Sequence, residues 1–145
     1  MFVKTNMNYV SNESLVVKKI NRGVMRWLED SGQLLEDMIK VHTPKDSGET
    51  AESWTHEVES DGRISASCTV KSGHPNASFE EFGTGDYATE PHYPGFKGKI
   101  PWKYQDDRGE WHTTDGKRPT QPAQRAFEVC SPIIRENGSR YILRG

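Results

Sequence analysis

The sequence predicts one α+β domain, with a long N-terminal helix and a C-terminal helix packed on an antiparallel sheet and with a projecting β-hairpin arm. Three observations predict this fold class. Apolar residues recur at helical spacing over residues 13–41, they alternate with polar residues over 54–71, and a second alternating pair of segments interrupts the stretch 86–120. A chain of 145 residues fits one domain of ordinary size.

The first predicted element is a long helix over residues 13–41, preceded by an N-terminal arm over residues 1–12. Ser11 or Asn12 can cap its start, and Thr43 before Pro44 ends it, because a residue that precedes proline is biased away from helical angles. Gly32 is the point where a bend is expected. The apolar stripe consists of Val16, Ile20, Val24, Trp27, Leu28, Leu34, Leu35, Met38 and Val41.

A helical turn and a hairpin follow the long helix. Glu49 and Glu52 complement the positive end of a short helix that starts after Ser47. Polar and apolar residues then alternate over residues 54–71, and Asp61-Gly62 interrupts the alternation with a tight turn. This pattern predicts a β-hairpin.

Residues 86–120 form a long excursion that is rich in Pro, Gly and aromatic residues. Loops of this length are usually functional or disordered unless they hold structure of their own. Segments 102–105 and 110–113 flank a polar turn and predict a second hairpin, in which Trp102 and Trp111 face each other across the strands. The excursion is therefore predicted to be a long aromatic loop or a β-arm.

The last predicted helix covers residues 121–134, opened by Pro122. Pro132 predicts a kink or an early end near Ser131. The remaining tail, residues 135–145, has no partner in its sequence neighbourhood and is expected to become ordered against another subunit. The apolar stripe of the helix consists of Ala123, Ala126, Phe127, Cys130 and Ile134.

Composition and charge limit the function classes. Hydrophobic residues make up only 32% of the chain, so partners are expected to cover part of its apolar surface. The net charge of −2 divides into −4 over residues 1–85 and +2 over 86–145, which suits head-to-tail contact between copies and not a dedicated nucleic-acid binder. Cys68 and Cys130 are expected to be reduced, buried and inert. No segment approaches the roughly 20 apolar residues that cross a membrane, so a soluble protein made in a cytoplasm is expected.

The candidate anion-binding and metal-binding motifs have structural explanations. Gly83 and Gly85 suggest an anion-binding loop, but the longer phosphate-loop fingerprints are absent and Glu80 and Glu81 would repel phosphate. A structural turn is therefore favoured. Five histidines are scattered without metal-ligand spacing. The sequence predicts no catalytic residue, cofactor site or metal site.

Adjacent acidic residues and the aromatic arm also suggest chemistry that their spacing does not favour. Glu80-Glu81 and the pair at 106–107 diverge because they are neighbours in the chain, whereas glycosidase carboxylates must converge on a substrate. The aromatic and basic residues over 93–104 could stack on nucleic-acid bases, but a protein interface is favoured because acids occupy the tip of the arm. The predicted subunit or partner interface comprises Tyr93, Phe96, Trp102, Tyr104, Trp111, Tyr141, Ile142 and Leu143.

Three motifs give the chain a family resemblance. Residues 46–53 are similar to an Asp-Thr-Gly-x-Leu-x-x-Ser element with Thr50 at the leucine position, and residues 76–84 are similar to Tyr-Ala-x-x-x-Glu-Phe-Gly-Thr with Asn76 at the tyrosine position. Residues 122–126 stand where the family opens its last helix. In this order the motifs resemble the siphophage neck or tail-completion (head–tail joining) protein family, and they are distantly similar to minor tail protein Z of lambda-like phages.

The resemblance implies a structural virion protein, not an enzyme, that forms a homo-oligomeric ring, for example a hexamer, in the neck or at the top of the tail. The implied partners are the head–tail connector or stopper, the tail terminator and the tail tube, with DNA at most passing through the ring and with no membrane or cofactor. Assembly is expected in the bacterial host cytoplasm. The residues predicted to form a structural junction between sheet and arm are Glu81, Phe82, Gly83, Thr84 and Gly85.

Two alternative functions stay open on the sequence. The first is a tail terminator, which would cap the tail and not join it to the head. The second belongs to another class, a small phage-encoded hydrolase or nuclease that uses Glu80, Glu81 or His112.

Overall fold

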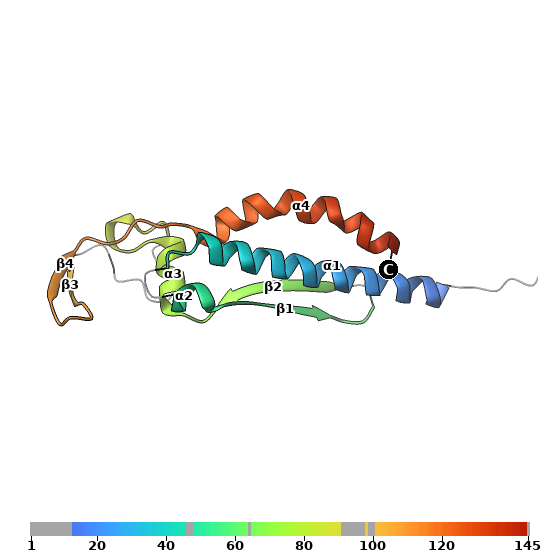
Figure 1. Ribbon diagram of the computed structural model, residues 1–145, viewed down its shortest axis with the longest axis horizontal. Coiled ribbons are helices and arrows are strands. Elements are labelled where there is room, and N and C mark those ends of the chain that lie inside the picture. The colour runs from blue at the N-terminus through green and yellow to red at the C-terminus, as the bar shows by residue number, and fades with distance from the viewer. Residues whose placement is uncertain (1–12, 46–47, 64, 91–97, 99–100, 145) are drawn as a thin grey trace, which may run out of the picture.

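Two long antiparallel helices form the length of the molecule, and a hairpin packs along one of them. A computed structural model describes residues 13–45, 48–63, 65–90, 98 and 101–144, so the predicted N-terminal arm lies outside the described residues. Helix α1 (Glu13–His42) lies between α4 (Pro122–Arg144) and the hairpin of β1 (Trp54–Ser60) and β2 (Ala66–Ser72) (Figure 1). The α+β class predicted from the sequence is confirmed.

Helix α1 is continuous through Gly32, the residue at which the sequence predicts a bend. A Cβ atom on this glycine would lie 2.6 Å from both the Cys68 Sγ and a ring carbon of His56. Glycine is therefore needed because the hairpin approaches the helix closely. The helix ends as predicted, with the Thr43 hydroxyl and N–H both donating to the Ile39 carbonyl at 2.7 and 2.8 Å.

The first hairpin has the predicted alternation. Trp54 pairs with Ser72 and Ser60 pairs with Ala66, after the short helix α2 (Glu49–Glu52). The turn is closed by the Asp61 carboxylate, which accepts hydrogen bonds from the N–H groups of Arg63 and Ser65. The face that carries His56, Val58, Cys68 and Val70 is half-buried, whereas the intervening residues are exposed.

The hydrophobic core is small and lies at the end of the hairpin nearest to α2. Its buried members are Ile39, Trp54, Ala77 and Ala126, with Met38, Val70 and Ala123 partly buried around them. Among the described residues, Ile39 and Trp54 are the only large buried side chains in this cluster. Much of the stability of the fold therefore depends on few contacts.

A half-buried imidazole joins the hairpin to α1. His56 is bound by the Glu36 carboxylate at Nδ1 (2.5 Å) and by the Glu29 carboxylate at Nε2 (3.0 Å), and Lys40 completes the group by pairing with Glu36. The pKa of His56 is raised, chiefly by the hydrogen bond to Glu36. The pKa of Glu36 is lowered, chiefly by the hydrogen bond to Lys40. Both shifts favour the charged forms.

Raising the pH through the elevated pKa of His56 is expected to weaken this attachment. A histidine with a raised folded-state pKa contributes its full stability below the unfolded pKa of about 6.5 and loses it as the pH rises through the folded value. The free energy of unfolding in urea should therefore be lower at alkaline pH than at mildly acidic pH. The variant His56→Gln should lack this component, so an identical pH profile for the two proteins would contradict the assignment.

The C-terminal helix differs from its prediction. It does not end near Ser131 or at residue 134 but continues through Pro132 to Arg144 as one helix. Residues 135–144 of the predicted tail therefore pack within their own chain and do not need another subunit to become ordered, whereas residue 145 lies outside the described residues. Trp27 Nε1 donates to the Ile134 carbonyl at 2.8 Å, and the Tyr141 hydroxyl donates to Asp30 at 2.5 Å. These long-range contacts stabilise turns that proline alone would disfavour.

Further elements complete the fold. Helix α3 (Pro75–Phe82) and the 3-10 turn η1 (Gly85–Tyr87) precede the second hairpin, which consists of β3 (Trp102–Gln105) and β4 (Trp111–Thr114). In the described part of the chain the strands form two separate two-stranded sheets.

The two cysteines are free, and burial raises the pKa of each thiol. Within the described ranges, neither long helix is apolar enough over a sufficient length to cross a membrane.

Candidate functional site

The residues predicted to join a sheet to the arm lie instead at and after the end of α3, and they connect this helix to the segment that returns from the second hairpin. Thr84 forms two hydrogen bonds with Lys117, from its N–H to the Lys117 carbonyl (2.9 Å) and from the Lys117 N–H to its hydroxyl (2.8 Å). The Asp86 N–H donates to the Asp115 carbonyl at 2.9 Å. Two chain segments that are about 30 residues apart are therefore held side by side.

Glycines are required where these two segments meet. Gly83 has φ 73°, and a Cβ there would lie 2.8 Å from the carbonyl oxygens of Lys117 and Tyr87. Gly85 has φ 59°, and a Cβ there would lie 2.0 Å from the Asp115 carbonyl oxygen. Side chains are excluded both by the left-handed backbone and by the neighbouring backbone.

The acids before the glycines are already occupied by structural contacts. Glu80 is buried, and its carboxylate accepts hydrogen bonds from Lys117 Nζ and from the Thr120 hydroxyl. The Glu81 carboxylate accepts the N–H groups of Ala123 (2.8 Å) and Gln124 (3.1 Å), which are at the start of α4. Glu81 thus acts as a capping group for a helix that lies about 40 residues further along the chain. The two carboxylates diverge, as their adjacency predicts.

The second hairpin, residues 102–114, is the predicted arm and lies at one end of the long axis (Figure 1). Trp102 pairs with Thr114, and Gln105 pairs with Trp111. Since Trp102 and Gln105 are three residues apart on β3, the two tryptophans are on opposite faces of the hairpin. The prediction that they face each other is wrong. Trp102 is half-buried, whereas the side of the arm that carries Trp111 is open, and Trp111 is 68% exposed.

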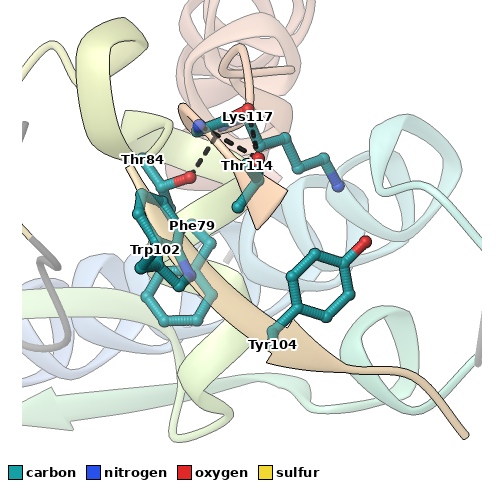
Figure 2. A pocket seen from close by; sticks show the side chains of 7 residues that line it. Phe79, Thr84, Trp102, Tyr104, Thr114 and Lys117 are labelled. Carbon is teal, nitrogen blue, oxygen red and sulfur yellow. Dashed lines mark hydrogen bonds between the residues drawn. The ribbon is translucent and has the colours of Figure 1, made fainter. Parts of the chain in front are cut away.

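The inner face of the arm borders an apolar cavity of about 350 Å³. Figure 2 shows the rings of Phe79 and Trp102 on one side of it and Tyr104 on the other, below Thr114 and Lys117. Lys117 Nζ is bonded to Glu80, so its charge is already neutralised at the rim. The cavity lies between α3 and the arm, and among the described residues that line it none is a nucleophile paired with a base.

Side chains of the arm's turn stabilise it. The Asp106 carboxylate accepts the N–H groups of Arg108 and Glu110, both at 2.9 Å, and binds His112 Nε2 at 2.9 Å. The hydrogen bond to His112 is the main cause of the lowered pKa of Asp106. The His112 ring also stacks on Tyr104. His112 is therefore explained as a residue that supports the turn.

Three side chains of the arm could hold a metal ion, because one ligand atom of each lies within 4.8 Å of the other two. These residues are Asp106, Glu110 and His112. The contacts of Asp106 to the turn account for its position without an ion. The arrangement gives no further reason to place a cation there.

The structure separates the predicted interface residues into two groups. Tyr93 and Phe96 lie outside the described residues. Trp102, Tyr104 and Trp111 are on the arm at one end of the molecule. Tyr141, Ile142 and Leu143 are at the C-terminal end of α4, near the opposite end (Figure 1). Tyr141 and Ile142 are half-buried, whereas Leu143 is exposed.

Some residues of the predicted apolar stripes are exposed on the surface. Val16 and Ile20 belong to an exposed apolar group on the first turns of α1, where Ile20 borders the turn of the first hairpin. Phe127, assigned to the apolar stripe of α4, is 58% exposed. Periodicity predicts which residues share a face of a helix, but it does not reveal whether the chain supplies a partner for that face. The exposed apolar residues of the two helices include Leu15, Val16, Val17, Ile20, Val41, Phe127, Val129, Ile133 and Leu143.

Comparisons with protein-family models, with curated proteins and with solved structures found no match.

Proposed function

We propose that this chain is a structural virion protein of a tailed bacteriophage, which completes the tail or neck and joins tail to head as a subunit of an oligomeric ring. The observation that carries the proposal is the exposed Trp111 on a hairpin at one end of an elongated molecule. A large aromatic side chain on a projecting element is typical of a contact that a partner buries. The motif resemblance supports the location in the neck.

Further features of the described residues support a role in assembly. The core is small, and apolar residues are exposed both on the first turns of α1 and along α4. Exposed apolar patches of this kind mark protein interaction sites. The acidic groups that an enzyme would need, Glu80 and Glu81, are engaged in holding the junction. The proposed partners are further copies of this chain and the neighbouring connector or stopper, terminator and tube proteins.

Truncating Trp111 is expected to weaken docking of the arm. An anchor residue of this type contributes roughly 2 kcal/mol or more to an interface, so virions made with Trp111→Ala should contain fewer joined tails. Thr113→Ala is a matched control, because Thr113 is exposed on the same face of the arm. The measurement is the yield of tailed particles by electron microscopy. A normal yield with Trp111→Ala would show that the arm is not the joint.

Particles produced without this protein test the function itself. We expect DNA-filled heads and finished tails that remain separate, because both precursors are complete and only their junction is missing. Tails of abnormal length would instead indicate the tail terminator function. Normally joined virions would contradict both functions.

A further inference from the structure

Two clusters of opposite charge lie toward the two ends of the molecule. Near the C-terminal end of α4, a cavity of about 410 Å³ is lined by Arg26 from α1 and by Arg140 and Arg144 from α4, together with Asn137 and Tyr141. At the opposite end of the long axis, the arm's turn carries Asp106, Asp107 and Glu110 (Figure 1). We call the first feature the arginine cavity and the second the acidic turn.

The arginine cavity has positive charge that its own surroundings do not neutralise. Glu136 lies 3.6 Å from Arg140, and both side chains are largely exposed. Across the described ranges, neither Arg26 nor Arg144 forms an ion pair, and the nearby Asp30 accepts the Tyr141 hydroxyl. One arginine in the last turn would suffice to complement the helix dipole. Three guanidinium groups from two helices line this cavity, which is more positive charge than the helix dipole requires. They fit a ligand that carries carboxylates.

The acidic turn has two exposed carboxylates that can bind a positively charged partner. Asp106 is committed to the turn by its backbone hydrogen bonds, but Asp107 and Glu110 are exposed. Trp111 follows immediately and is also exposed. Arg108 lies between these two acids, but the tip of the arm carries more acidic than basic groups, next to an aromatic ring. This combination can pair with guanidinium groups through both charge and stacking.

We propose that the arginine cavity of one copy binds the acidic turn of a second copy. This contact rests on the proposed function, in which identical subunits assemble, and it adds which surfaces meet. The exposed apolar first turns of α1, which include Leu15, are at the same end of the molecule as the arginine cavity and offer an apolar surface to the incoming Trp111 (Figure 1). Since the two surfaces differ, the contact is heterologous, and its repetition gives a ring or a filament.

The test measures self-association of the purified full chain by sedimentation velocity. One variant carries Arg140→Glu and Arg144→Glu, and a second carries Asp107→Lys and Glu110→Lys. Each should weaken association about tenfold or more, because like charges then oppose each other. A chain with all four reversals should regain association, since the charges are again complementary. The control Arg125→Glu with Arg135→Glu reverses two exposed charges on the same helix, away from the cavity, and should associate as the wild type does.

Three results would overturn the contact: a wild-type chain that stays monomeric at high concentration, double reversals that associate normally, or four reversals that fail to restore association. Circular dichroism melting curves establish that each variant is folded. Binding of duplex DNA that is lost with the arginine reversals, while self-association is unchanged, would also overturn it in favour of a phosphate ligand. Normal association of the reversed chains would leave the joining function standing, because that function fails only if particles made without the protein are joined.

Discussion

Replacing Gly83 by valine is expected to leave little or no soluble folded protein. The backbone at this position has φ 73°, a region in which a β-branched residue is a genuine outlier. The added Cβ would also lie 2.8 Å from two backbone carbonyl oxygens and from Pro119 Cδ. The strain and the clash together should cost roughly 4 kcal/mol or more, a large part of the stability of a typical domain.

Gly73→Val is the matched control for this substitution. Gly73 is exposed, and a Cβ added to it would meet no heavy atom within 4 Å, so the same valine should change stability little. Soluble yield and urea unfolding measure both variants. A normal melting curve for Gly83→Val would mean that the junction between α3 and the returning segment is not needed for folding.

Truncating Trp54 to alanine is expected to cost about 3–5 kcal/mol. Its side chain is 8% exposed and forms the centre of the small core, against Ile39, Ala77 and Ala126. Because the described residues offer few other large buried side chains, the surrounding structure has little with which to fill the resulting cavity. The free energy of unfolding in urea should fall accordingly.

Trp54→Phe separates the loss of packing from the loss of the indole N–H. Among the described residues the Trp54 Nε1 atom is buried without a hydrogen-bond partner, so its removal releases an unsatisfied donor. The phenylalanine variant should therefore lose less than half the stability that the alanine variant loses. Equal losses for the two variants would contradict this interpretation of the core.

The sequence predicts the elements that are determined by residues close together in the chain. The span of α1 and the first hairpin follow from hydrophobic periodicity and from turn residues, and both were found close to their predicted bounds. The strands of the arm were found in the same way. The relative facing of Trp102 and Trp111 was missed because a register that pairs Gln105 with Trp111 places them on opposite faces.

Long-range contacts explain what the sequence could not predict. The extension of α4 past Pro132 depends on Trp27 and Asp30, which are more than 100 residues away in the chain. The capping of α4 by Glu81 likewise joins distant segments. Folding also brings Arg26 beside Arg140 and Arg144, a cluster that the charges of the two halves of the chain, −4 and +2, do not reveal.

Immunogold labelling of purified virions with antibodies against this chain tests the proposed role most directly. The predicted result is gold at the junction between head and tail, on nearly every complete particle. Free heads that lack the protein should be unlabelled. Virions that are infectious, complete and free of the protein would contradict the proposal that the chain joins tail to head.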